Sequence, residues 1–173
     1  MTFIFTVEEG TGDPDANSYV DVESAADYIG TNVYTATDWA ALSDDDQANA
    51  LSRASKYIDN IVQWNGTKVT ADSGLRWPRA GVYDQDGFEI PDDVIPQLLK
   101  DAVCELASVM ISEDWTGTQG TRGFKEIQVD VIDLKMQDNY VRPSLPTYVI
   151  DMLSPLGTVN RGTRPSFKRI IRT

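Results

Sequence analysis

Apolar residues recur at helical spacing in two stretches of the first third of the chain. In residues 21–29 they lie three or four positions apart, with Asp21 placed to cap the first turn and Gly30 to end the last. A longer helix is predicted over residues 44–63, because Ser43 has the position of an N-cap and three aspartates follow it. The first part of the chain is therefore expected to be helical.

The same spacing returns later in the chain. After Pro96, a wide apolar face recurs to about Ser112, which predicts a buried helix at the centre of the core. A last short helix is predicted over residues 147–153. Cys104 falls inside the apolar pattern of the helix after Pro96, so we expect a buried thiol rather than a reactive one.

Turn residues and alternating patterns separate these helices. Asp86-Gly87 lies between two short apolar runs and predicts a small hairpin or an ordered loop. Beyond the glycine-rich residues 116–123, apolar positions alternate and then change phase, which predicts a β insertion near residues 124–137. A turn of the Asx type is expected at Asp13, because the calcium-loop spacing that begins there lacks the required glycine and glutamate.

Together these elements predict a mainly α fold: a helical bundle with a β-hairpin or loop insertion and an extended C-terminal tail. A length of 173 residues suits a single domain. We assign residues 1–159 to this domain and residues 160–173 to the tail. No apolar run approaches the roughly 18 to 20 residues that span a bilayer, so no membrane segment is expected.

Charge divides the chain at the same place. All 27 acidic residues lie before Asn160, and only 10 of the 15 basic residues do, so the chain through Val159 has a net charge of −17. The tail has the remaining five basic residues and no acidic one, which gives it +5. A chain polarised in this way is expected to meet partners of complementary charge.

The tail has the pattern of a docking segment. Three apolar side chains fall at i, i+3 and i+4, so one helical turn would gather them into a stripe with basic residues beside it. Burial of that stripe would set the affinity, and the charges would steer the encounter. The residues of this predicted docking tail are Arg161, Arg164, Phe167, Lys168, Arg169, Ile170, Ile171 and Arg172.

Enzyme chemistry finds little support in the composition. Histidine is absent and there is one cysteine, so Ser-His and Cys-His nucleophile pairs cannot be assembled. Adjacent acids such as Glu8-Glu9 and Asp92-Asp93 are interpreted as solvated faces or helix caps, because two-carboxylate hydrolysis needs acids at a set separation across a cleft. We expect no enzyme activity, and we assign no catalytic residue, cofactor or metal.

The segment Leu75-Arg76-Trp77-Pro78-Arg79 has two interpretations. Trp77 is expected to be a packing anchor, with Arg76 and Arg79 pairing with carboxylates within or between subunits. Alternatively, two guanidinium groups beside an indole could stack bases and contact phosphates of single-stranded DNA. The excess of negative charge favours the first interpretation, because an anionic surface repels a polyanion.

Several motifs together resemble one known family. They are, in chain order, Asn17-Ser18-Tyr19-Val20 with Ala25-Ala26-Asp27-Tyr28, Arg53-Ala54-Ser55-Lys56-Tyr57-Ile58-Asp59, Leu75-Arg76-Trp77-Pro78-Arg79, and Ile90-Pro91 ahead of residues 102–107. Over roughly residues 17–115 the chain resembles the head-tail connector, or adaptor, proteins of tailed bacteriophages. Members are often labelled DnaT-like single-stranded-DNA-binding proteins.

The resemblance implies a structural virion protein without enzyme activity. Its subunits, about twelve of them, would form a ring in the phage neck between the portal protein and the tail-completion, stopper or tail proteins. Double-stranded DNA would pass through this ring without specific binding, and an acidic channel would suit that passage because it does not hold phosphates. The alternative that we carry forward is a single-stranded-DNA-binding replication protein.

Overall fold

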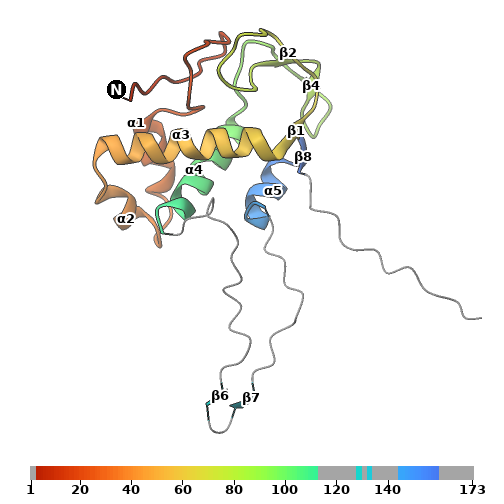
Figure 1. Ribbon diagram of the computed structural model, residues 1–173. Helices are drawn as coiled ribbons and strands as arrows, with labels where there is room; N and C mark the ends of the chain where they lie inside the picture. The colour runs from red at the N-terminus through yellow and green to blue at the C-terminus, as the bar shows by residue number, and fades with distance from the viewer. Residues whose placement is uncertain (1–2, 113–127, 130–131, 134–143, 160–173) are drawn as a thin grey trace, which may run out of the picture.

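Two packed helices form the centre of the protein. The structure is a computed structural model that describes residues 3–112, 128–129, 132–133 and 144–159 (Figure 1). Helix α3 (Asp44–Ile61) packs along helix α4 (Gln97–Met110). The prediction of a long helix from Asp44 is confirmed, and the Ser43 hydroxyl caps it by accepting a hydrogen bond from the Asp46 N–H at 3.2 Å. The helix ends at Ile61, before the expected limit, because the next residues form a strand.

Three shorter helices cover this pair. Helices α1 (Val22–Ile29) and α5 (Thr147–Leu153) both pack on α4, and both agree with the sequence prediction. The carboxylate of Asp21 caps α1 by accepting from the Ser24 N–H at 2.8 Å. Helix α2 (Ala36–Ala40) was not predicted, because five residues with one buried side chain, Trp39, give no measurable periodicity.

The strands of the described residues pair as short antiparallel ribbons. They are β1 (Val62–Trp64) with β8 (Gly157–Val159), β2 (Thr67–Lys68) with β3 (Arg79–Ala80), β4 (Val82–Tyr83) with β5 (Glu89–Ile90), and β6 (Gln128–Val129) with β7 (Ile132–Asp133). The pair β4–β5 confirms the hairpin predicted at Asp86-Gly87. The pair β6–β7 lies inside the predicted β insertion, whose other residues lie outside the described part of the chain.

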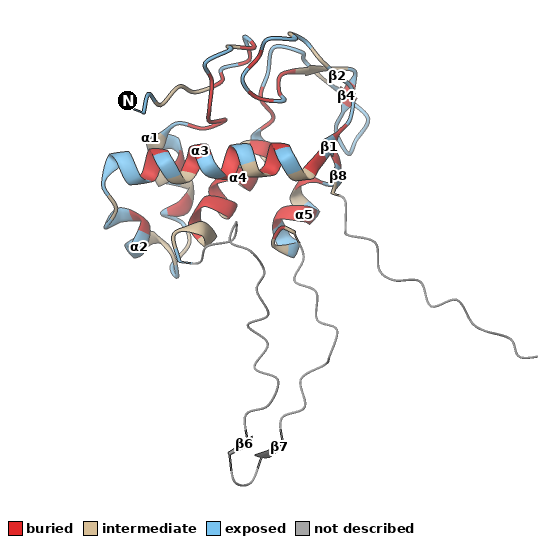
Figure 2. Ribbon diagram, in the orientation of Figure 1, coloured by how far each residue is buried: buried red, intermediate tan, exposed pale blue. Residues whose placement is uncertain are grey.

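The core lies between the helices and the irregular segments above them. Figure 2 shows buried residues along the inner faces of α3, α4 and α5 and in the loops near β1 and β2. Leu51, Ile58, Leu99 and Leu106 are among the fully buried side chains. The mainly helical fold class is therefore confirmed. The basic tail, residues 160–173, lies outside the described residues.

One member of an acidic pair departs from the sequence prediction. Glu8 was expected on a solvated face or at a helix cap, but, unlike the exposed Glu9, it is fully buried. Its carboxylate accepts hydrogen bonds from the backbone N–H groups of Gly10, Gly12 and Asp13, each at 2.8 Å. These three charge-assisted hydrogen bonds offset the cost of desolvating the Glu8 carboxylate. The carboxylate thereby organises the loop before α1.

The same loop contains the predicted Asx turn. The Asp13 carboxylate accepts a hydrogen bond from the Asp15 N–H at 2.8 Å, which confirms that prediction. Within the described part of the chain, no group of three or more Cys, Asp or Glu side chains is arranged to hold a metal ion. Nor does any described helix combine the length and apolar character needed to cross a bilayer.

Candidate functional site

Three of the motifs that carry the resemblance, those containing Tyr19, Asp59 and Arg76, meet at the buried carboxylate of Asp59, near the end of α3. The Tyr19 hydroxyl donates to this carboxylate and lies 2.8 Å from both of its oxygens. The Trp64 Nε1–H donates to Oδ1 at 3.1 Å, and the Arg76 backbone N–H donates to Oδ2 at 2.9 Å. Tyr19 Oη in turn lies 3.0 Å from the backbone nitrogen of Arg76 and 3.2 Å from that of Trp77, and accepts from both. We call these groups the Asp59 network.

Burial controls the electrostatics of this network. Desolvation raises the pKa of Asp59 to about 6, although hydrogen bonds from Tyr19, Arg76 and Trp64 act in the opposite direction. Burial and the nearby Asp59 carboxylate raise the pKa of Tyr19 well above its ordinary value, so its hydroxyl stays protonated and remains a donor. All the donors to Asp59 belong to the fold itself. The network therefore ties the segment before α1 and the loop before β3 to helix α3.

Trp77 lies in the core. Its side chain has no exposed surface and meets Trp64 edge-on, with ring centroids 5.9 Å apart and an interplanar angle of 90°. Its buried Nε1–H has no hydrogen-bond partner among the described residues. A base cannot stack on an indole that is enclosed on all sides, so the stacking interpretation fails at this residue.

The two arginines beside Trp77 have different surroundings. Arg79 donates to three backbone carbonyl oxygens, those of Asn65 at 2.6 Å, Gly66 at 2.7 Å and Arg76 at 3.1 Å. Among the described residues its hydrogen-bond partners are thus carbonyl groups rather than carboxylates, and its pairing with a carboxylate of another subunit stays a prediction. The side chain of Arg76 is exposed, and its pairing with a carboxylate of another subunit stays a prediction.

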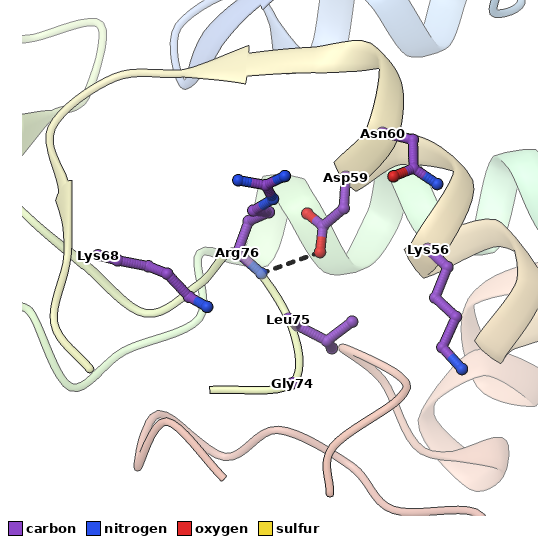
Figure 3. A pocket seen from close by; sticks show the side chains of 7 residues that line it. All are labelled: Lys56, Asp59, Asn60, Lys68, Gly74, Leu75 and Arg76. Carbon is purple, nitrogen blue, oxygen red and sulfur yellow. Dashed lines mark hydrogen bonds between the residues drawn. The ribbon is translucent and has the colours of Figure 1, made fainter. Parts of the chain in front are cut away.

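A pocket of about 340 Å³ opens beside the Asp59 network. Figure 3 shows Lys56, Asp59 and Asn60 on α3, with the Asp59 carboxylate directed toward Arg76 and with Lys68 on the far side of Arg76 from the helix. Gly74 and Leu75 complete the lining. Lys68 is held in place because its Nζ donates to the Ser73 carbonyl at 2.8 Å.

Sequence reasoning missed this pocket. Basic residues are outnumbered by acidic ones in this sequence, 15 against 27. Lys56, Lys68 and Arg76 are separated along the chain, however, and no short motif joins them. With three cationic side chains against the single carboxylate of Asp59, the pocket is suited to an anionic group.

Cys104 lies on the buried face of α4, as expected. Burial raises the pKa of its thiol to about 12, so almost none of it is the reactive thiolate at neutral pH. The predicted docking tail, from Arg161 to Arg172, lies outside the described residues.

The whole chain, residues 1–173, matches the family model described as "Putative DnaT-like ssDNA binding protein". The chain belongs to this family. No curated protein and no solved structure matches it. The description of the family agrees with the alternative carried forward from the sequence, single-stranded-DNA binding, and it does not mention a phage neck.

Proposed function

We propose that this member of the DnaT-like family is a structural, non-enzymatic subunit of a ring-shaped adaptor in the phage neck. The ring joins the portal protein to tail-completion, stopper or tail proteins and surrounds the double-stranded DNA without binding it specifically. Its site of action is the head-tail junction of a virion assembled in the host cytoplasm. About twelve subunits form the ring, as the resemblance to phage adaptors implies.

The burial of Trp77 is the observation that carries this proposal. In a single-strand binder, aromatic side chains must present a face on which bases stack. The indole in the Arg-Trp-Pro-Arg segment instead packs on Trp64, and the backbone around it serves the Asp59 network. Motif residues that fix a fold are expected in a protein whose task is to present surfaces to other subunits.

The charge of the chain supports the same proposal. A net charge of −17 through Val159, the difference between 27 acidic and 10 basic residues, repels phosphates over most of the domain. An anionic channel lets a duplex slide because no phosphate is held. The basic residues of 160–173 then remain available for docking to the portal.

Electron microscopy of the purified chain mixed with the portal protein of the same phage tests the proposal. We expect rings that cap the portal at its tail-facing end. A chain with residues 160–173 deleted should fold normally and fail to cap. Portals that stay uncapped by the full-length chain at every concentration would refute the adaptor role.

Single-stranded-DNA binding is the second candidate, and the family description together with the cationic pocket favours it. A protein with this function should bind an oligonucleotide with an affinity that decreases steeply as the salt concentration rises, since each phosphate contact releases counterions. Fluorescence anisotropy with a labelled single strand measures this directly. Binding with such a salt dependence, without portal capping, would replace the adaptor proposal with this one.

A further inference from the structure

Positive and negative charges gather at opposite ends of helix α3. No lysine or arginine precedes Arg53 in the chain, so all the charged side chains of α1, α2 and the first half of α3 are acidic. We define the acidic end as four exposed carboxylates of α2 and the first turn of α3, namely Asp38, Asp44, Asp45 and Asp46. The cationic pocket lies at the other end of α3.

The two ends are well separated along the helix. Helix α3 has 18 residues and is therefore about 27 Å long at 1.5 Å per residue. The acidic end lies at its N-terminus and is exposed, whereas Lys56 and Asp59 line the pocket in its last turns. One subunit consequently presents an exposed acidic cluster at one end of α3 and a pocket lined by cations at the other.

Two cations of the pocket are available to a partner. Lys56 and Arg76 are exposed, and neither side chain forms an ion pair within the described residues. Lys68 is fixed by the Ser73 carbonyl and adds a positioned charge. The one anion of the pocket, Asp59, has at most a single negative charge against three cations, so it offsets only part of this charge.

We propose that the pocket receives carboxylate side chains from the acidic end of a second copy of this chain. The inference rests on the proposed function and specifies how neighbouring subunits of the ring meet. A contact between two different surfaces is heterologous, and repetition of such a contact closes into a ring when the rotation allows it. The volume of about 340 Å³ admits carboxylate side chains rather than a whole helix.

A second copy fits the pocket better than a nucleic acid does. A strand with one phosphate in the pocket would bring its other phosphates close to a domain whose net charge through Val159 is −17, which repels them. Carboxylates of the acidic end, in contrast, would meet the exposed cations Lys56 and Arg76, which reduces the repulsion within their own cluster. Both partners gain, and the contact needs no component beyond the chain itself.

A charge-swap experiment tests this contact. The variant Lys56→Glu/Arg76→Glu makes the pocket negative, and the variant Asp38→Lys/Asp45→Lys makes the acidic end positive. Each variant alone should self-associate at least about tenfold more weakly than the wild-type chain in sedimentation velocity, because like charges then meet across the contact. An equimolar mixture should recover association, because each reversed surface finds a reversed partner.

Controls separate this effect from loss of the fold. Asp92→Lys/Asp93→Lys changes the net charge by the same amount and in the same direction as Asp38→Lys/Asp45→Lys, at exposed residues outside both surfaces, and should associate at least as strongly as the wild-type chain. Thermal melting checks that every variant folds. Should a variant unfold, carbodiimide crosslinking of mixed isotopically light and heavy wild-type chains provides a second measurement, with Lys56 expected to join Asp38 or Asp45 of the other copy.

Each remaining outcome would overturn the contact. Rings that both variants form as readily as the wild-type chain would exclude the pocket and leave the adaptor proposal standing. A wild-type chain that caps portals but neither self-associates nor forms intermolecular crosslinks would also exclude the contact and leave the adaptor proposal standing. An oligonucleotide that binds the wild-type chain and not Lys56→Glu/Arg76→Glu would assign the pocket to phosphates instead.

Discussion

Replacing Asp59 with asparagine should change how the stability of the protein depends on pH. The carboxylate is buried, and desolvation raises its pKa to about 6 from the ordinary 3.8. Asparagine has nearly the same shape and does not ionise. A comparison of the two chains at each pH therefore isolates the cost of charging this one group, because the other acids titrate in both.

The direction and size follow from linkage. A carboxyl group whose pKa is raised on folding stabilises the native state relative to the unfolded state only while it is protonated. Its contribution to the free energy of unfolding is therefore fully present below pH 3.8 and is lost as the pH rises through about 6. A shift of roughly two units corresponds to about 3 kcal/mol. The free energy of unfolding of wild type minus that of Asp59→Asn should therefore fall by about 2 to 3 kcal/mol between pH 3.5 and pH 7.

Urea unfolding followed by tryptophan fluorescence supplies this difference, since Trp64 donates to the Asp59 carboxylate. If Asp59→Asn fails to fold, an NMR titration of the wild-type Asp59 carboxyl carbon measures the same pKa. A difference that stays constant with pH would mean that the carboxylate is not desolvated. A difference that rises with pH would mean that hydrogen bonding to the anion outweighs desolvation, and would refute the reasoning.

Three further predictions concern other parts of the chain. Trp77→Ala should destabilise the fold by about 3 to 5 kcal/mol. Trp77→Phe should cost clearly less, because it keeps a large ring and removes the native indole N–H, which is buried without a hydrogen-bond partner; equal urea midpoints for the two variants would contradict this. Deletion of residues 160–173 should leave the melting temperature within a few degrees of wild type, because β8 still pairs with β1; a collapse on deletion would make the tail part of the core. The Cys104 thiol should react with a maleimide only as fast as the protein unfolds, as its rate against urea will reveal; fast labelling of the native chain would refute its burial.

Local signals in the sequence determined most of the helices. Periodicity and capping residues act within one or two turns, so Ser43 and Asp21 could be assigned as N-caps without knowledge of the rest of the chain. The division of charge at Asn160 is likewise a property of the sequence. The short strands were less accessible, because β1 pairs with β8 at the far end of the described chain and neither is long enough to show a pattern.

Only the tertiary structure decided what the motifs do. Tyr19 and Asp59 are 40 positions apart, and Tyr19 and Arg76 are 57 apart, yet their hydrogen bonds form one network. The same folding buries Trp77, for which the sequence offered both packing and base stacking, and gathers scattered cations into a pocket. The spacing of residues along a chain predicts contacts only between residues a few positions apart. Whether a distant side chain is desolvated, paired or exposed depends on which segments pack together, and that is set by the whole core.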